Sequence, residues 1–140
     1  MKRLFSKLAI SATIILACAS TISAERSFPS SESIEYFSTS VWITNICYRA
    51  NSTPEVRMKV QAMDRENRRV AAKIKKLKPE IFGIFQRDLE RHKKEIISLM
   101  GTDNGEYFAQ QIIDTCIMPR LLIMESLARP VGKWIDSVEN

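Results

Sequence analysis

The sequence has few of the residues that enzyme active sites most often require. Its 140 residues include one histidine, His92, and no HExxH, GxSxG, CxxC or glycine-rich phosphate loop occurs. His92 falls on the apolar face of a predicted helix, where a histidine at the core or its edge is commoner than a catalytic one. We therefore predict that the protein is not an enzyme and has no catalytic residues, no metal site and no cofactor.

Glycine and proline are also scarce, with four and five residues respectively. This excludes collagen-like and low-complexity chains, and the 45% hydrophobic content excludes a disordered polar tail. The length suits one compact domain.

The first 24 residues have the three zones of a secretory signal. A cationic start with Lys2, Arg3 and Lys7 is followed by an apolar run over residues 8–19 and a small, polar stretch ending at Ala24. The apolar run is too short for a bilayer span, which needs roughly twenty residues. We predict a cleaved signal peptide at 1–24, a flexible lead-in at 25–33, a single helical domain at 34–140 and a periplasmic or secreted location.

Cys18 leaves a second possibility open. Residues 15–18 resemble the bacterial lipobox, in which the cysteine becomes the lipidated first residue, although Leu16 fits that motif poorly. A lipid anchor on Cys18 is therefore the minor alternative to ordinary export.

The remaining cysteines, Cys47 and Cys116, form an even pair in a small exported domain, which favours a disulfide over two buried thiols. A disulfide needs Cα atoms roughly 4.4–6.8 Å apart, so the pairing also predicts that the segments carrying the two cysteines are neighbours.

Apolar periodicity predicts an all-α fold, a small bundle of about four principal helices stapled by the Cys47–Cys116 disulfide. The first helix begins near Ile34, although the run 41–44 would also suit a strand. The second follows a capping box at Ser52 and Glu55, and steps of four and three residues give it a continuous seam: Val56, Val60, Met63, Asn67, Val70, Ile74 and Leu77. We expect Asn67, the polar member, to be tolerated near an edge, the alternative being that it fixes the register of the helix packing.

Two further helices follow Pro79. The first spans about 80–100 and ends at a left-handed Gly101, and its predicted inward side chains are Ile81, Phe85, Leu89, His92, Ile96 and Leu99 or Met100. The second begins near Glu106 after a capping box with Asp103, bends at Pro119 and ends at 129–132. Its predicted inward positions include Phe108, Ile112, Cys116, Ile123 and Leu127.

Positive charge is concentrated in the second helix. Residues 57–78 have a net charge of +7, although the chain without residues 1–24 has only +2. We predict that this helix contacts an acidic protein surface or anionic lipid headgroups. The alternative is that its basic residues only keep the exposed face of the helix in contact with solvent. Nucleic acid is not expected, because no aromatic residue lies between the cations. The predicted partner-binding residues are Arg57, Lys59, Arg65, Arg68, Arg69, Lys73, Lys75, Lys76 and Lys78.

These features predict an exported, non-catalytic interaction protein of the bacterial envelope, such as a chaperone, an inhibitor or an immunity-type partner. The basic helix would steer an acidic partner toward it. The alternative is a peripheral membrane-associated protein or a lipoprotein that binds anionic headgroups.

The leader and the cysteine pairing are testable by mass spectrometry. We expect the product exported by a bacterial host to have the mass of residues 25–140 with one disulfide, and to gain the mass of two hydrogen atoms on reduction. A retained leader, a lipid on Cys18 or a mass unchanged by reductant would contradict this prediction.

Overall fold

The computed structural model describes residues 29–50 and 52–139. Five helices form this part of the chain: α2 (Ser31–Cys47), α3 (Pro54–Leu77), α4 (Pro79–Met100), α5 (Gly105–Ile113) and α6 (Met118–Glu139). The predicted all-α bundle is confirmed. The predicted signal peptide, residues 1–24, and the start of the lead-in lie outside the described residues.

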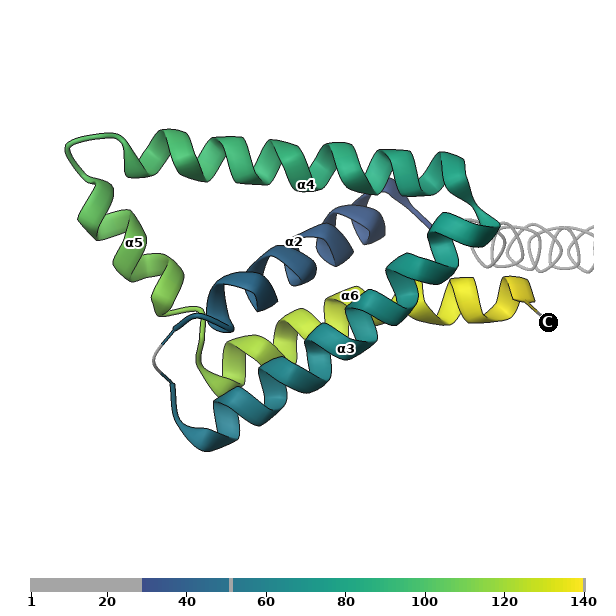
Figure 1. Ribbon diagram of the computed structural model, residues 1–140, viewed down its shortest axis with the longest axis horizontal. Coiled ribbons are helices and arrows are strands. Elements are labelled where there is room, and N and C mark those ends of the chain that lie inside the picture. Colours follow the sequence, from purple (N-terminus) through teal and green to yellow (C-terminus); the bar gives the residue numbers. More distant parts are fainter. Residues whose placement is uncertain (1–28, 51, 140) are drawn as a thin grey trace, which may run out of the picture.

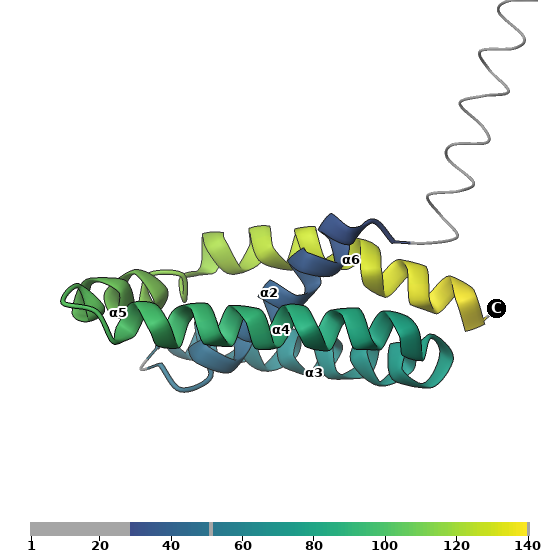
Figure 2. The same cartoon turned by 90° about the horizontal axis from the view of Figure 1, so that it is seen from above.

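The first helix, α2, lies at the centre of the bundle. It contacts α3, α4, α5 and α6, and it passes between α6 and the pair formed by α3 and α4 (Figures 1 and 2). Short side chains allow these close approaches, since Ser38, Ser40 and Thr44 are all buried. Their hydroxyls are satisfied: Ser38 donates to the Ile34 carbonyl and Thr44 to the Val41 carbonyl, each at 2.9 Å. Burial of these hydroxyl groups at the centre of the bundle therefore does not cost the free energy of an unsatisfied hydrogen-bonding group.

The predicted seam of α3 is confirmed from Val56 to Ile74, with Leu77 half-buried at the end. Asn67 differs from expectation, because it is 8% exposed and its Nδ2 donates to Ser40 Oγ at 3.2 Å. It is thus a buried member of the interface between α2 and α3, and it is hydrogen-bonded to Ser40 across that interface.

Two apolar clusters fill the bundle. The larger joins four helices, and its buried members are Ile34, Phe37, Val70, Ile74, Ile81, Phe85, Ala128, Val131, Trp134 and Ile135. The smaller surrounds the cysteines and contains Cys47, Val56, Val60, Met63, Cys116 and Leu121. Cys47 and Cys116 form the predicted disulfide, with Cα atoms 5.4 Å apart. It links the end of α2 to the segment between α5 and α6.

The last predicted helix is wrong in its boundaries. The chain leaves helical geometry after Ile113 and restarts at Met118, so Pro119 occupies the first turn of α6. A proline is tolerated there because the first-turn amides have no intrahelical partner. The predicted end at 129–132 is also wrong: α6 continues through Pro130 to Glu139 and bends along its length (Figure 2).

The restart at Met118 changes which residues of α6 face inward. Ile123 is 60% exposed and Leu127 is 37% exposed, contrary to the prediction. The buried positions are Leu121, Ala128, Val131, Trp134 and Ile135. Burial of the last three, beyond Pro130, explains why the helix survives the loss of one backbone hydrogen bond.

Several helix ends also differ from the predictions. α2 begins at Ser31, three residues early, because Ser30 Oγ accepts a hydrogen bond from the Ser33 amide. Thr53, not Ser52, caps α3 by accepting from the Val56 amide. Gly101 has a φ of −82°, so the predicted left-handed stop is wrong. At the start of α5, the N-cap Asn104 makes no side-chain capping bond, so the predicted capping box is also wrong.

The inward face predicted for α4 holds only for its first half. Ile81 and Phe85 are buried, Leu89, His92 and Ile96 are half-buried, and Leu99 and Met100 are exposed. The remaining turns of α4 extend past the central helix toward α5 (Figure 1), so no core lies beneath them.

We predict that removal of the disulfide destabilises the bundle. On the chain-entropy model, a loop closed over a sequence separation of 69 residues contributes about 4 kcal/mol. The double variant Cys47→Ala/Cys116→Ala should lose most of this free energy of unfolding in urea titrations. Reductant should lower the stability of the native protein by a similar amount and leave that of the double variant unchanged. Equal urea midpoints for the native protein and the double variant without reductant would contradict the prediction.

Candidate functional site

The basic residues of α3 fall into two sets according to the helix face that they occupy. Lys59, Arg69 and Lys73 flank the buried seam on the side that faces α6, where each meets an acidic side chain. Lys59 Nζ lies 2.7 Å from Glu125, and Lys73 Nζ lies 3.0 Å from Asp136. These three are the inner cations, and they join the parallel helices α3 and α6 at two places (Figure 1).

Arg69 is the centre of the second of these contacts. Its guanidinium donates to Asp136 at 2.8 Å and to Glu66 at 2.6 Å. Hydrogen bonds from Arg69 and then Lys73 lower the pKa of Asp136 to about 2. The bond from Arg69 also lowers the pKa of Glu66, and the two carboxylates raise the pKa of Arg69. The inner cations are thus engaged in holding α3 to α6.

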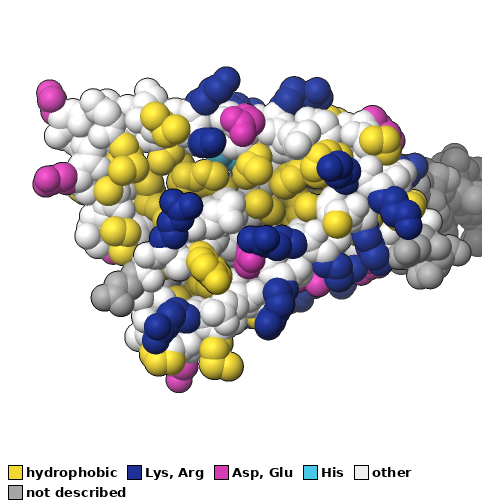
Figure 3. All heavy atoms as spheres, in the orientation of Figure 1, with side chains coloured by type: hydrophobic (Ala, Val, Ile, Leu, Met, Phe, Trp, Pro, Cys, Tyr) yellow, Lys and Arg dark blue, Asp and Glu magenta, His cyan; other side chains and the backbone are white. Residues whose placement is uncertain are grey.

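The second set points away from the bundle, and we call it the outer cationic row: Arg57, Arg65, Arg68, Lys75 and Lys76. It covers about 28 Å of α3 at the rise of an α-helix, and dark-blue side chains follow that helix in Figure 3. Arg68 pairs with Asp64 at 2.9 Å but is 78% exposed. Lys75 Nζ lies 5.8 Å from the centre of the Phe82 ring.

The other members of the row, Arg57, Arg65 and Lys76, make no ion pair with any residue among 29–50 and 52–139. Lys78, the ninth predicted residue, is half-buried at the junction of α3 and α4. The predicted binding residues are therefore on one helix but not on one surface. Five of the nine form the exposed outer cationic row.

Sequence reasoning missed the acidic counterparts of the inner cations. Glu125 and Asp136 are eleven residues apart, which is close to three full helical turns, so they lie on the same stripe of α6. This spacing could have revealed them if the limits of α6 had been predicted correctly.

A second missed feature is an apolar surface where α4 meets α5. Large side chains are exposed there, namely Ile97, Leu99, Met100, Tyr107 and Ile113, and no residue of α5 is buried. Figure 3 shows hydrophobic side chains gathered near this end of the molecule. Helical periodicity predicted inward positions in this part of α4, but it could not show that α4 extends beyond the core.

His92 lies at the edge of α4 and is 19% exposed. Its Nε2 lies 3.4 Å from Thr39 Oγ1 of α2, and its Nδ1 lies 3.8 Å from Glu95. Among the described residues, no group of three His, Cys, Asp or Glu side chains is placed to hold a metal ion. Within the same residues, no helix is both long and apolar enough to span a bilayer.

Comparison of the chain with protein-family models, curated proteins and solved structures finds no match.

The contact between α3 and Asp136 predicts a specific response to acid. Because the pKa of Asp136 is lower in the folded protein than in the unfolded chain, its stabilising effect is complete above about pH 4 and is lost as the pH falls toward 2. Asp136→Asn should lower the free energy of unfolding by about 1 kcal/mol at neutral pH. The difference in Tm between the two proteins should shrink from pH 5 to pH 2.

Asp103→Asn is the matched control, since Asp103 is exposed in the loop before α5. Its difference in Tm from the native protein should change much less with pH. A constant difference for Asp136→Asn over the same range would contradict the proposed ion pair.

Proposed function

We propose that the protein is an exported, non-enzymatic interaction protein of the bacterial envelope, which binds an acidic protein surface through the outer cationic row. The observation that carries this proposal is the division of the α3 cations. Acidic residues of α6 engage the inner cations, while three members of the outer row have no ion pair among the described residues.

Two properties make α3 suitable as a rigid platform for such contacts. Its buried seam and its pairs with Glu125 and Asp136 fix the helix along most of its length. Exposed cations in a row then attract an anionic surface over a distance that depends on ionic strength. Binding of a preformed row also avoids the entropy of ordering a flexible segment.

The exported location is supported by the disulfide, because such bonds persist in oxidising compartments and are rare in the cytosol. The leader pattern of residues 1–24 supports the same location from the sequence. A chaperone, an inhibitor and an immunity-type partner are all compatible with one charged binding face.

Anionic lipid headgroups are the second candidate for this row, since they present the same charge. The amino-acid content of α3 favours a protein partner: its outward side carries one large exposed apolar residue, Met58. A helix that lies in a membrane interface normally inserts a broad apolar face.

Charge reversal tests the proposal. The variant Arg65→Glu/Arg68→Glu/Lys76→Glu should lose at least tenfold in affinity for an acidic partner isolated from the bacterial envelope. Native binding should also weaken steeply between 50 and 300 mM salt. Affinity is measured by titration calorimetry with the isolated partner.

The control variant Arg87→Glu/Lys93→Glu/Lys94→Glu makes the same change in net charge on exposed positions of α4. It should retain native affinity. Equal losses in the two variants would show that total charge, rather than the row, controls binding. Stronger binding of the native protein to phosphatidylglycerol vesicles than to any envelope protein would favour the lipid alternative and overturn the proposal.

A further inference from the structure

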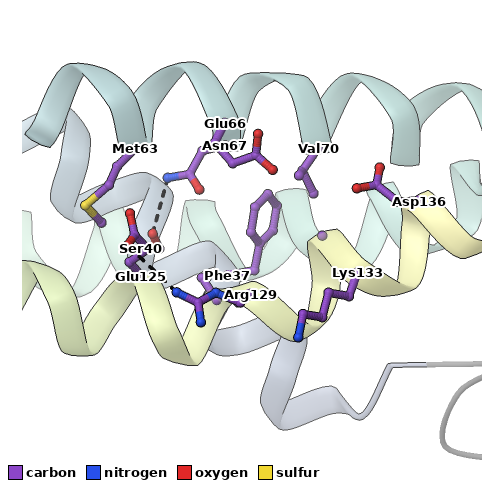
Figure 4. Close-up of a pocket in the computed structure, with 12 residues that line it drawn as sticks. Phe37, Ser40, Met63, Glu66, Asn67, Val70, Glu125, Arg129, Lys133 and Asp136 are labelled. Carbon is purple, nitrogen blue, oxygen red and sulfur yellow. Dashed lines mark hydrogen bonds and ion pairs between the residues drawn. The ribbon is translucent and has the colours of Figure 1, made fainter.

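A cavity of about 220 Å³ lies between α2, α3 and α6, away from the outer cationic row. Its apolar wall consists of Phe37, Met63, Val70 and Ala128, all buried side chains. Figure 4 shows the Phe37 ring between α3 and α6, with charged side chains around it. An apolar protein cavity of roughly 150 Å³ can hold benzene, so this space accommodates about six to eight carbon atoms.

Each end of the cavity is lined by a carboxylate that is held in an ion pair. Glu125 lines one end and is held by Lys59, while Asp136 lines the other and is held by Arg69 and Lys73. A space of this volume suits a small molecule.

The polar atoms on the α3 side already have partners. Asn67 donates to Ser40 (Figure 4). Glu66 accepts from Arg69. The three carboxylates around the cavity are thus matched by the inner cations of α3, and little negative charge is left for a cationic ligand or a divalent metal ion.

Two further positive charges line the cavity, and both come from α6. Lys133 lines the cavity and makes no ion pair with any described residue. Arg129 lies 3.9 Å from Glu125 through one nitrogen, a long contact, and its side chain is 57% exposed. Arg129 and Lys133 are one helical turn apart on α6. Their guanidinium and ammonium groups can therefore donate hydrogen bonds to the two oxygens of one carboxylate.

We propose that this cavity binds a small amphiphilic carboxylate. Its apolar part, a chain of about six to eight carbons, lies against Phe37, Met63 and Val70. Its carboxylate is received by Arg129 and Lys133. This site is separate from the outer cationic row and does not depend on the function proposed for it.

Gly132 provides a way to fill the site. A Cβ atom at this position would lie 3.4 Å from Val70 Cγ2 and 3.8 Å from Glu66 Oε1, which are ordinary contacts. A leucine there extends into the cavity from α6. Gly83 of α4 is the matched control, because the nearest atom to an added Cβ belongs to the Arg87 side chain at 3.9 Å.

The test uses the exported protein with its disulfide intact and titration calorimetry with octanoate as the probe. Octanoate should bind more tightly than octylamine and octanol by at least tenfold, because charge-assisted bonds fix only the anion. Affinity should rise about fourfold for each methylene group from butanoate to octanoate and then level off as the cavity fills.

Three variants separate this site from nonspecific binding. Gly132→Leu should abolish octanoate binding, and Gly83→Leu should leave it unchanged. Arg129→Gln/Lys133→Gln should weaken octanoate about tenfold and leave octanol unchanged. Arg129 and Lys133 are both exposed, so we expect this last variant to fold. It therefore still tests the proposal if Gly132→Leu fails to fold.

Several results would overturn the proposal. An absence of saturable octanoate binding at millimolar concentration is one such result, and octanol or octylamine binding with the affinity of octanoate is another. Unchanged octanoate affinity in a folded Gly132→Leu protein, or in Arg129→Gln/Lys133→Gln, would equally exclude the cavity. Charge reversal of Arg65, Arg68 and Lys76 should not change octanoate binding beyond a general effect of net charge, which the α4 control variant measures.

Discussion

The Cys47–Cys116 bond holds the start of α6 against the end of α2, and the arrangement of the charged surfaces depends on it. Cys116 lies in the short segment before Met118, so the bond places the point from which α6 runs beside α3. That placement turns Glu125 and Asp136 toward Lys59 and Lys73. It also brings Ala128 and Gly132 to the same interface, where short side chains leave the cavity beneath the ion pairs.

The seven excess positive charges in residues 57–78 can coexist on one helix because two different environments receive them. Cations beside the seam are neutralised by α6, which is acidic at the matching positions. Cations on the outer side are exposed to solvent, which screens them from one another, although Lys75 also lies 5.8 Å from the centre of the Phe82 ring of α4. Without Glu125 and Asp136, the inner set would repel the outer set and leave charges beside a buried interface.

The parts of the fold that the sequence could predict are those in which one local rule acts alone. The α3 seam follows from a strict apolar period, and the disulfide follows from two cysteines in an exported chain. The α6 boundaries needed tertiary information, because Pro130 breaks helices in general but here precedes three strongly buried side chains. Asn67 needed it as well, since its partner Ser40 is distant in the sequence.

The candidate site was predictable only in part, for the same physical reason. Composition identified all nine cations, but the helix face occupied by each one decides whether it is available, and that depends on the neighbour that covers α3. The cavity had no sequence signal, since it arises from Gly132 and Ala128 meeting Phe37 and Val70 across three helices. The charges of α3 therefore act on two sides: the inner set holds the walls of the cavity together, and the outer set remains free to meet a partner without disturbing them.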